Sequence, residues 1–270
     1  MEATGRNMDE KMKIAIVQHD IVAESVGQTL SKIESLLAGV EAVDLVVLPE
    51  MFATGFDVDD ASVAEPASGG AVLRWMQSLA AARRSAVEGS VAVDDNGLRN
   101  GLRNRHYFVY PDGTYRYYDK RHLFSFGGEN RLYRQGGSPC VVEYKGVRLL
   151  LQTCYDLRFP VFSRNRGGCY DVAVYVASWP KSRISAWDTL LPARAIENLA
   201  YVVAVNRVGA VGKLEYDGHS RVIDYLGRTV TGVADGEEGV AVAEIDLSRL
   251  RAFRSKFPAL DDADRFTVDL

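Results

Sequence analysis

The sequence predicts a single α/β domain in which helices cover one face of each sheet and the other face packs on a second sheet. Helical patterns alternate along the chain with strand-length runs that are apolar at nearly every position, which is typical of strands buried on both faces. The length of 270 residues and the hydrophobic content of 47% suffice for one large core. We therefore expect one domain over residues 12–270 and a disordered leader at 1–11.

The elements follow in a regular order. Apolar strands are expected at 12–18 and 44–49, and apolar residues recur at helical spacing within 25–38 and 70–84. Turn residues at 95–97 and 111–113 predict strands and hairpins between 87 and 119. The remaining expected elements are strands at 141–144, 147–153, 171–177, 201–206, 219–224 and 239–245, a helix at 185–199 and a charged tail. Pro192 either kinks that last helix or marks the first turn of a shorter one.

Composition narrows the class of partner. The net charge is −4, from 32 basic and 36 acidic residues, and no long run of either sign predicts a nucleic-acid or membrane-surface patch. The partner is therefore expected to be a small molecule. Three cysteines at wide spacing favour a reducing compartment over a disulfide framework. Residues 1–11 contain no apolar segment typical of a secretory signal, and the apolar runs are too short to span a membrane. We expect a cytoplasmic protein.

Cys154 is the first candidate for chemistry. It follows the apolar strand at 147–153 and precedes Tyr-Asp-Leu-Arg-Phe-Pro, which must turn away from the sheet. Ligands of α/β proteins bind at the carboxyl ends of strands, and backbone N–H groups after the thiol could face a developing oxyanion. The alternative is a buried structural thiol, the role expected for Cys140 and Cys169.

Two charged residues also follow apolar or aromatic strands. Glu50 ends LVVLPE, and the apolar segment after it would desolvate the carboxylate and raise its pKa toward that of a useful base. Lys120 lies at a strand end that leads into an aromatic loop, where a fixed ammonium near a thiol lowers the pKa of that thiol. Taken singly, a solvated surface position is the expected reading for each of these two residues.

Other motif classes are absent from the sequence. There is no HExxH, no Cys/His cluster at metal-ligand spacing, no phosphate-binding GxxxxGK[ST] and no GxSxG, so neither a metal nor a nucleotide cofactor is expected. A Cys-His dyad that uses His122 or His219 stays open.

Three ordered motifs, LVVLPE, YDKRHLF and LLLQTCYDLRFP, resemble the nitrilase (carbon–nitrogen hydrolase) superfamily. The candidate residues are separated by 70 positions from Glu50 to Lys120 and by 34 to Cys154, and the resemblance extends from MKIAIVQ to GVAVAEIDL. It implies a Glu-Lys-Cys triad at these three residues, with a second glutamate at Glu129. It also implies a four-layer α-β-β-α sandwich, commonly a homodimer, that works without a cofactor.

The segments CYDLRFPVFSRN, VASWP, ARAIENLAYVVAVNRVG and GHSRVIDYLG look most like the ω-amidases, which hydrolyse the terminal amide of 2-oxoglutaramate and 2-oxosuccinamate. Pro192 departs from that pattern. The resemblance implies attack by Cys154, proton transfer by Glu50, and an oxyanion held by Lys120 and the backbone N–H of Tyr155. Other amidases of the superfamily, acting on N-carbamoyl compounds or deaminated glutathione, and a catalytically silent binding module are the alternatives.

A substrate carboxylate near a thiol needs a cation, and Arg binds carboxylates in a bidentate manner. Arg183 and Lys181 follow the VASWP strand end and are the candidates for this anchor. Arg158 is also near Cys154, but an ion pair with Asp156 is the simpler expectation for it. The aromatic residues Trp179, Phe124 and Phe56 are candidate pocket walls.

Overall fold

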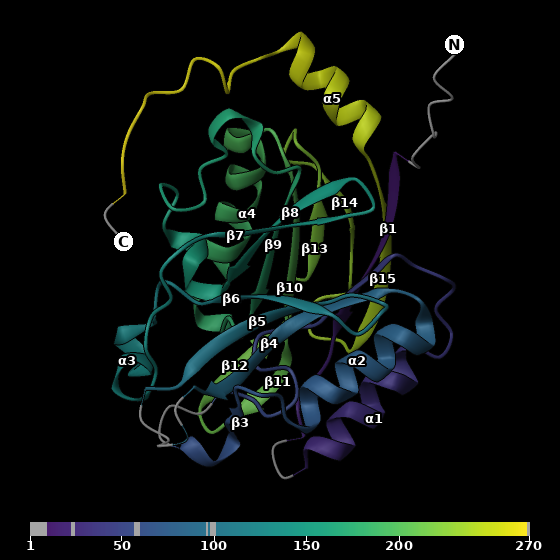
Figure 1. Cartoon of the computed structure of the whole chain (residues 1–270), viewed down its shortest axis with the longest axis vertical. Coiled ribbons are helices and arrows are strands. Elements are labelled where there is room, and N and C mark those ends of the chain that lie inside the picture. The colour runs from purple at the N-terminus through teal and green to yellow at the C-terminus, as the bar shows by residue number, and fades with distance from the viewer. Residues whose placement is uncertain (1–9, 23–24, 57–59, 96, 98–100, 269–270) are drawn as a thin grey trace.

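Two stacked β-sheets with helices outside each form the body of the protein (Figure 1). The computed structural model describes residues 10–22, 25–56, 60–95, 97 and 101–268. Helices α1 (Val26–Leu37) and α2 (Ala71–Arg83) cover one sheet, and α4 (Ile184–Asn198) covers the other. The predicted α-β-β-α sandwich is confirmed.

Each sheet has parallel strands at its centre and antiparallel strands toward its edges. The order in the first sheet is β15 (Gly239–Asp246), β1 (Lys11–Gln18), β2 (Leu45–Val47), β4 (Ala86–Asp94), β5 (Arg103–Val109) and β6 (Tyr115–Asp119), with β3 (Glu65–Pro66) beside β4. The order in the second sheet is β14 (Thr229–Gly232), β13 (Arg221–Ile223), β10 (Tyr201–Asn206), β9 (Val172–Ala177), β8 (Val147–Thr153) and β7 (Cys140–Tyr144). The parallel pairs are β1–β2, β2–β4, β8–β9 and β9–β10, together with the short β3–β4 pair.

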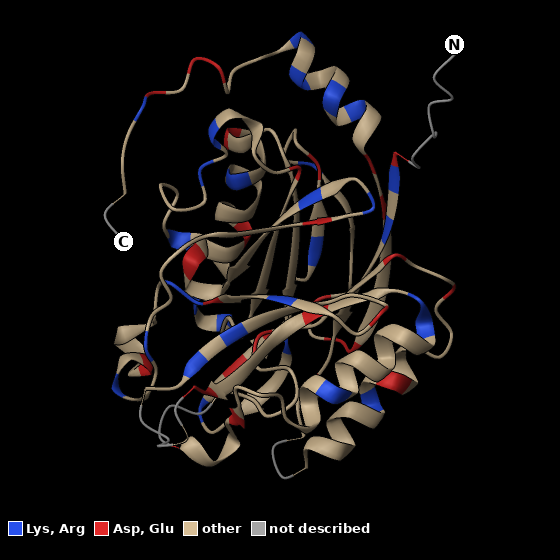
Figure 2. Ribbon diagram, viewed as in Figure 1, with Lys and Arg blue, Asp and Glu red and all other residues tan. Residues whose placement is uncertain are grey.

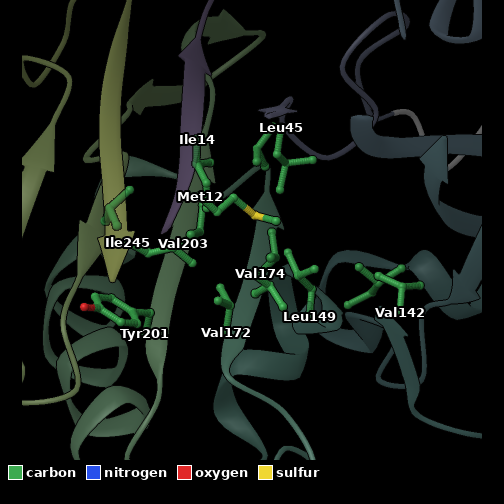
Figure 3. Close-up of a cluster of buried hydrophobic side chains, with 14 of the residues drawn as sticks. Met12, Ile14, Leu45, Val142, Leu149, Val172, Val174, Tyr201, Val203 and Ile245 are labelled. Atoms are coloured by element: carbon green, nitrogen blue, oxygen red, sulfur yellow. The ribbon is translucent and has the colours of Figure 1, made fainter. Parts of the chain in front are cut away.

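Alternation of side chains between two apolar layers explains why β9, a central strand, is apolar at every position. In β9, Val172 and Val174 belong to the core between the sheets, whereas Ala173 and Tyr175 pack toward α4. Side chains from both sheets meet in that central core, among them Met12 from the first sheet and Val174 from the second (Figure 3). Because successive residues of a strand point to opposite faces, a strand between two apolar layers has no polar side.

The three long predicted helices and the main strands are found within two residues of their expected bounds. The hairpin between β5 and β6 turns as expected, with Tyr110 and Thr114 bonded through their backbones at 2.8 Å. The other expected turn lies partly outside the described residues, because Asn96 is not described. Helix α4 runs unbroken through Pro192, so this residue does not begin a shorter helix.

Several elements were not predicted from the sequence. They are helix α3 (Glu129–Leu132), helix α5 (Leu247–Lys256) in place of part of the charged tail, the hairpin of β11 (Val208–Val211) and β12 (Leu214–Asp217), and β14. The first strand also begins at Lys11, and Glu10 accepts a backbone bond from Leu247, so these two residues belong to the fold. The rest of the predicted leader, residues 1–9, lies outside the described residues.

Basic and acidic residues are interspersed along the ribbon (Figure 2). Within the described ranges, no helix is both long enough and apolar enough to cross a membrane. All three cysteines are free.

A buried histidine and a buried glutamate face each other inside the core, away from the triad residues. The Nε2 atom of His106 lies 3.7 Å from Oε2 of Glu88, and both side chains are fully buried on neighbouring strands β4 and β5. Neither side chain has a hydrogen-bond partner for its polar atoms. Burial raises the pKa of Glu88, because a charged carboxylate loses its hydration there, and His106 only partly opposes this effect.

We expect Glu88→Gln to change how stability depends on pH. A carboxyl whose pKa is raised by folding stabilises the native state at low pH, and that contribution is lost as the pH rises through its native pKa. The free energy of unfolding of the wild type should therefore fall relative to Glu88→Gln as pH rises, by up to about 1.4 kcal/mol per pH unit. Urea unfolding of both proteins at pH 5 and pH 8 measures this, and a constant difference would contradict the prediction.

Candidate active site

The carboxyl ends of strands from both sheets deliver the candidate residues to one region. Glu50 comes three residues after β2, Cys154 directly follows β8, and Ser178 directly follows β9. Cys154 has φ of 48° and Met51, the residue after Glu50, has φ of 49°. Non-glycine residues are uncommon in this left-handed region, and such strain gathers at functional sites. The chain therefore turns sharply just where each strand presents its polar group.

Lys120 joins both glutamates by direct ion pairs. Its Nζ lies 2.8 Å from Oε1 of Glu50 and 2.9 Å from Oε2 of Glu129. The exposed fractions of the Lys120, Glu50 and Glu129 side chains are 1%, 2% and 0%, so solvent does not screen these contacts. The three predicted residues from the ends of β2 and β6 and from α3 thus form one buried charge cluster.

Further donors fix the orientation of the two carboxylates. The side-chain amide of Asn104 in β5 donates to Oε1 of Glu50 at 2.7 Å and to Oε1 of Glu129 at 3.2 Å. The backbone N–H of Ser178 donates to Oε2 of Glu50 at 2.9 Å, and that of Phe124 donates to Oε2 of Glu129 at 2.6 Å. Both oxygens of each carboxylate are therefore engaged, which fixes the side chains in one orientation.

A close backbone approach brings the Glu129 segment to Lys120. The N–H of Gly136 donates to the carbonyl of Lys120 at 2.9 Å. A Cβ atom at Gly136 would overlap the carbonyl oxygen of Asp119, so only glycine permits this contact.

The charges of the cluster shift its pKa values in linked directions. Burial acts to lower the pKa of Lys120, but Glu129 and Glu50 outweigh it and hold that pKa well above its ordinary value. Burial raises the pKa of Glu129 against the opposing effect of Lys120. Burial also raises the pKa of the Cys154 thiol well above its ordinary value, with Glu50 raising it further and Lys120 lowering it. The lysine is thus charged and the thiol protonated near neutral pH.

Asp156 braces the turn that carries Cys154. Cys154 begins the short 3-10 helix η3 (Cys154–Arg158), and the fully buried Asp156 accepts bonds from the N–H of Thr153 at 2.9 Å and from Oη of Tyr118 at 2.8 Å. Its other oxygen pairs with Nδ1 of His122 at 2.7 Å. The expected Arg158–Asp156 ion pair was therefore wrong, because His122 and Tyr118 already engage this carboxylate.

The same contacts bear on the Cys-His alternative. His122 is held by Asp156 and stacks on Phe159 with ring centroids 3.8 Å apart. His219 lies 3.0 Å from both carboxylate oxygens of Asp188. Across the described ranges neither histidine is hydrogen-bonded to Cys154, whereas Glu50 and Lys120 act on the pKa of its thiol. The geometry favours the Glu-Lys-Cys arrangement.

A small pocket opens beside the cysteine. It encloses about 260 Å³, including open solvent at its mouth, and its lining residues are Phe124, Cys154, Tyr155, Arg158, Ser178, Trp179, Pro180 and Arg183. Trp179, Phe124 and Arg183 therefore lie where the sequence placed them. Lys181 does not line the pocket, because its exposed side chain points to Asp217, 3.9 Å away. Phe56 instead lies beside Lys120, with its ring centroid 5.5 Å from Nζ.

Sequence reasoning missed three residues of this region. Ser178 follows β9 as Cys154 follows β8, so the expectation that ligands bind at the carboxyl ends of strands could have identified it. Asn104 is a polar residue within a buried strand, which is a weaker signal. Tyr216 lies in the unpredicted β11–β12 hairpin. Burial is the main cause that raises the pKa of its phenol, and electrostatic interactions with Arg207, Cys154, Glu50 and Arg183 place it near the site.

No group of three or more His, Cys, Asp or Glu side chains within the described residues is arranged to hold a metal ion.

Comparison with known proteins agrees with this geometry. The family model described as carbon-nitrogen hydrolase matches residues 13–255. The omega-amidase YafV of Yersinia enterocolitica is 42% identical over 95% of this chain and 98% of its own, and the 2-oxoglutaramate amidase of Bacillus subtilis is 33% identical over 93% and 97%. The structure of XC1258 from Xanthomonas campestris, a CN-hydrolase superfamily protein with an arsenic adduct in its active site, is 40% identical. Its TM-score is 0.91, and the match covers 96% of this chain and 99% of that one. This chain belongs to the carbon-nitrogen hydrolase family.

Proposed function

We propose that this protein is an ω-amidase that hydrolyses the terminal amide of 2-oxoglutaramate and 2-oxosuccinamate to the dicarboxylic acid and ammonia. The observation that carries the proposal is the half-buried Cys154 at the wall of a small pocket, beside the buried Glu50–Lys120–Glu129 cluster. Relatives named omega-amidase and 2-oxoglutaramate amidase, which align with nearly the whole chain, support it.

The first half of the reaction forms a thioester. The sulfur of Cys154 attacks the amide carbonyl carbon while its proton passes to Glu50. The negative charge on the carbonyl oxygen is held by the Lys120 ammonium and by the backbone N–H of Tyr155, which is at the second position of η3 and has no acceptor within that helix. Such donors contribute about 3–4 kcal/mol each in other enzymes. The C–N bond then breaks, and Glu50 returns the proton to the departing nitrogen, which leaves as ammonia.

The second half releases the acid. Water gives a proton to Glu50 and attacks the thioester carbonyl, the C–S bond breaks, and the proton returns to the sulfur. Glu50 is suited to both halves because Ser178 and Asn104 fix its two oxygens. Glu129 acts as a positioning residue that holds Lys120.

We also propose that the protein is a cytoplasmic homodimer. Three free cysteines support a reducing compartment such as the cytoplasm, and the resemblance implies a homodimer.

The substrate assignment predicts the outcome of an amide panel. Ammonia release should be fastest from 2-oxoglutaramate and 2-oxosuccinamate and much slower from N-carbamoyl amino acids. Deaminated glutathione, whose leaving group is the dipeptide cysteinylglycine and not ammonia, should be cleaved equally slowly when the dipeptide is measured. Cys154→Ala should retain less than about a hundredth of the wild-type rate, because the nucleophile is lost, while circular dichroism should show an intact fold.

Cys169→Ala is the matched control, since Cys169 is an exposed cysteine, and it should keep wild-type activity. A preference for the carbamoyl compounds would replace the ω-amidase assignment with another amidase. Substantial activity in Cys154→Ala would exclude this cysteine as the nucleophile.

The charge on Glu50 should control the thiol. The wild-type thiol should ionise above the ordinary cysteine pKa of about 8.5, because burial and Glu50 raise its pKa. Glu50→Gln removes the charge that raises this pKa but keeps the side-chain size, so the alkylation profile of Cys154 should move to lower pH. Iodoacetamide labelling followed by peptide mass spectrometry measures it, with Cys169 in the same sample as an internal reference. An unchanged or higher midpoint would mean that Glu50 does not act on the thiol.

The acyl-enzyme should be open to trapping. Hydroxylamine added during turnover should divert the thioester to a hydroxamate, and acid quenching should leave an acyl mass on the peptide that contains Cys154. The same experiment with Cys154→Ala gives the background. If neither product forms during wild-type turnover, direct attack by water becomes the better mechanism.

A further inference from the structure

We propose that Arg183, assisted by Arg158, binds the substrate carboxylate and makes the enzyme selective for acid-bearing amides over neutral ones. This inference rests on the proposed amidase function. It assigns the selectivity to two guanidiniums, only one of which the sequence pointed to.

Both guanidiniums lie at the pocket that contains the thiol. Arg183 and Arg158 line it together with Cys154. The guanidinium carbon of Arg183 lies 4.9 Å from the ring centroid of Phe124, and that of Arg158 lies 4.9 Å from the ring of Trp179. Stacking on an aromatic face leaves the N–H groups at the edge of a guanidinium free to donate, and these are the groups that bind a carboxylate.

Neither cation has an acidic partner in the part of the chain that the structure describes. Other cations nearby are paired: Lys181 lies 3.9 Å from Asp217, and Nη2 of Arg207 lies 2.8 Å from Asp20. Two half-buried guanidiniums without a counterion, on the walls of one small pocket, fit an anion that arrives with the substrate.

The buried cluster leaves no side-chain cation unpaired for the acid end of the substrate. The carboxyl groups of Glu50 and Glu129 both contact the ammonium of Lys120, which is the one cation of that cluster. Coulomb interactions are strong where solvent is excluded. Arg158 and Arg183 place two positive charges at the pocket wall, so an acid-bearing amide can bind beside Cys154.

Arg183 is the better held of the two. Its carbonyl accepts a bond from Nε1 of Trp179 at 2.8 Å, its N–H donates to Pro180 at 2.9 Å, and it directly precedes α4. The backbone of Arg183 is therefore fixed before substrate binds. Arg158 ends η3, the short 3-10 helix that Cys154 begins. One helical turn therefore carries both the nucleophile and this second cation.

The test compares ammonia release from 2-oxoglutaramate and from its methyl ester, which lacks the negative charge. Ammonia reports amide cleavage only, so hydrolysis of the ester itself does not interfere. In the wild type, kcat/KM should be higher for the acid. Arg183→Ala should lower the acid-to-ester ratio of kcat/KM about 10- to 100-fold, the usual effect of losing a hydrogen-bonded charge pair, while the ester rate changes little. Arg183→Lys should restore part of the ratio, and Arg158→Ala should lower it less.

Lys181→Ala is the matched control. It removes a positive charge from the same short turn but outside the pocket, so the ratio should stay at the wild-type value. Structural damage would lower the rates for acid and ester together and leave the ratio unchanged.

Calorimetric binding of 2-oxoglutarate, the diacid product, separates the two ways in which the idea can fail. If the wild type releases no ammonia from either compound, yet binds 2-oxoglutarate in a way that Arg183→Ala abolishes, the proposed function is wrong and the anion site stands. If the wild type cleaves both and prefers the ester, the selectivity assigned to Arg183 is wrong. If the wild type prefers the acid and both arginine variants keep that preference and bind 2-oxoglutarate like the wild type, the anion site is wrong and the amidase function stands. Loss of the preference in Lys181→Ala alone would also overturn the assignment.

Discussion

The ammonium of Lys120 between the carboxylates of Glu50 and Glu129 is the interaction on which the rest of the site depends. It ties together the ends of β2 and β6 and the short helix α3, all with almost no exposure to solvent. Burying charge is costly unless every charge is paired and hydrogen-bonded, and removing one partner typically costs about 3–5 kcal/mol. Asn104 and the N–H groups of Ser178 and Phe124 satisfy the remaining oxygens. Most of these groups come from the first sheet and the loop after it, and Ser178, which follows β9, joins the cluster to the second sheet.

Stacking the sheets also aligns the nucleophile. Ser178 from the second sheet donates from its N–H to Glu50 of the first, and Tyr118 of the first donates to Asp156, which braces the turn at Cys154 in the second. These bonds cross between the sheets in both directions. They hold Cys154 in a left-handed conformation that an isolated strand end would leave. The apolar core beneath fixes the spacing of the layers, and the polar bonds at its edge fix the register.

Much of the fold and of the charge cluster could be predicted from the sequence, because both depend on local patterns. Apolar runs marked the central strands, and the ordered motifs marked Glu50, Lys120 and Cys154. The β11–β12 hairpin carries few buried residues and helix α5 has a low apolar content, so neither produces a strong pattern. The partners of Asp156 and the surroundings of Arg158 depend on which side chains the fold brings close from distant segments. Neighbouring residues in the sequence do not reveal these contacts.

The site divides two electrostatic tasks between its interior and its pocket. Burial raises the pKa of Cys154 and Glu50 raises it further, which keeps the thiol protonated until a carbonyl is in place. In the proposed mechanism Glu50 accepts the proton in the same step as the attack, so no free thiolate has to persist. The carboxyl groups of Glu50 and Glu129 already pair with Lys120, and the two guanidiniums stacked on Phe124 and Trp179 supply the positive charge at the pocket wall, where we propose that the substrate carboxylate binds. Keeping the thiol protonated and binding an anion are thus assigned to different side chains, which the carboxyl ends of the strands from the two stacked sheets bring together.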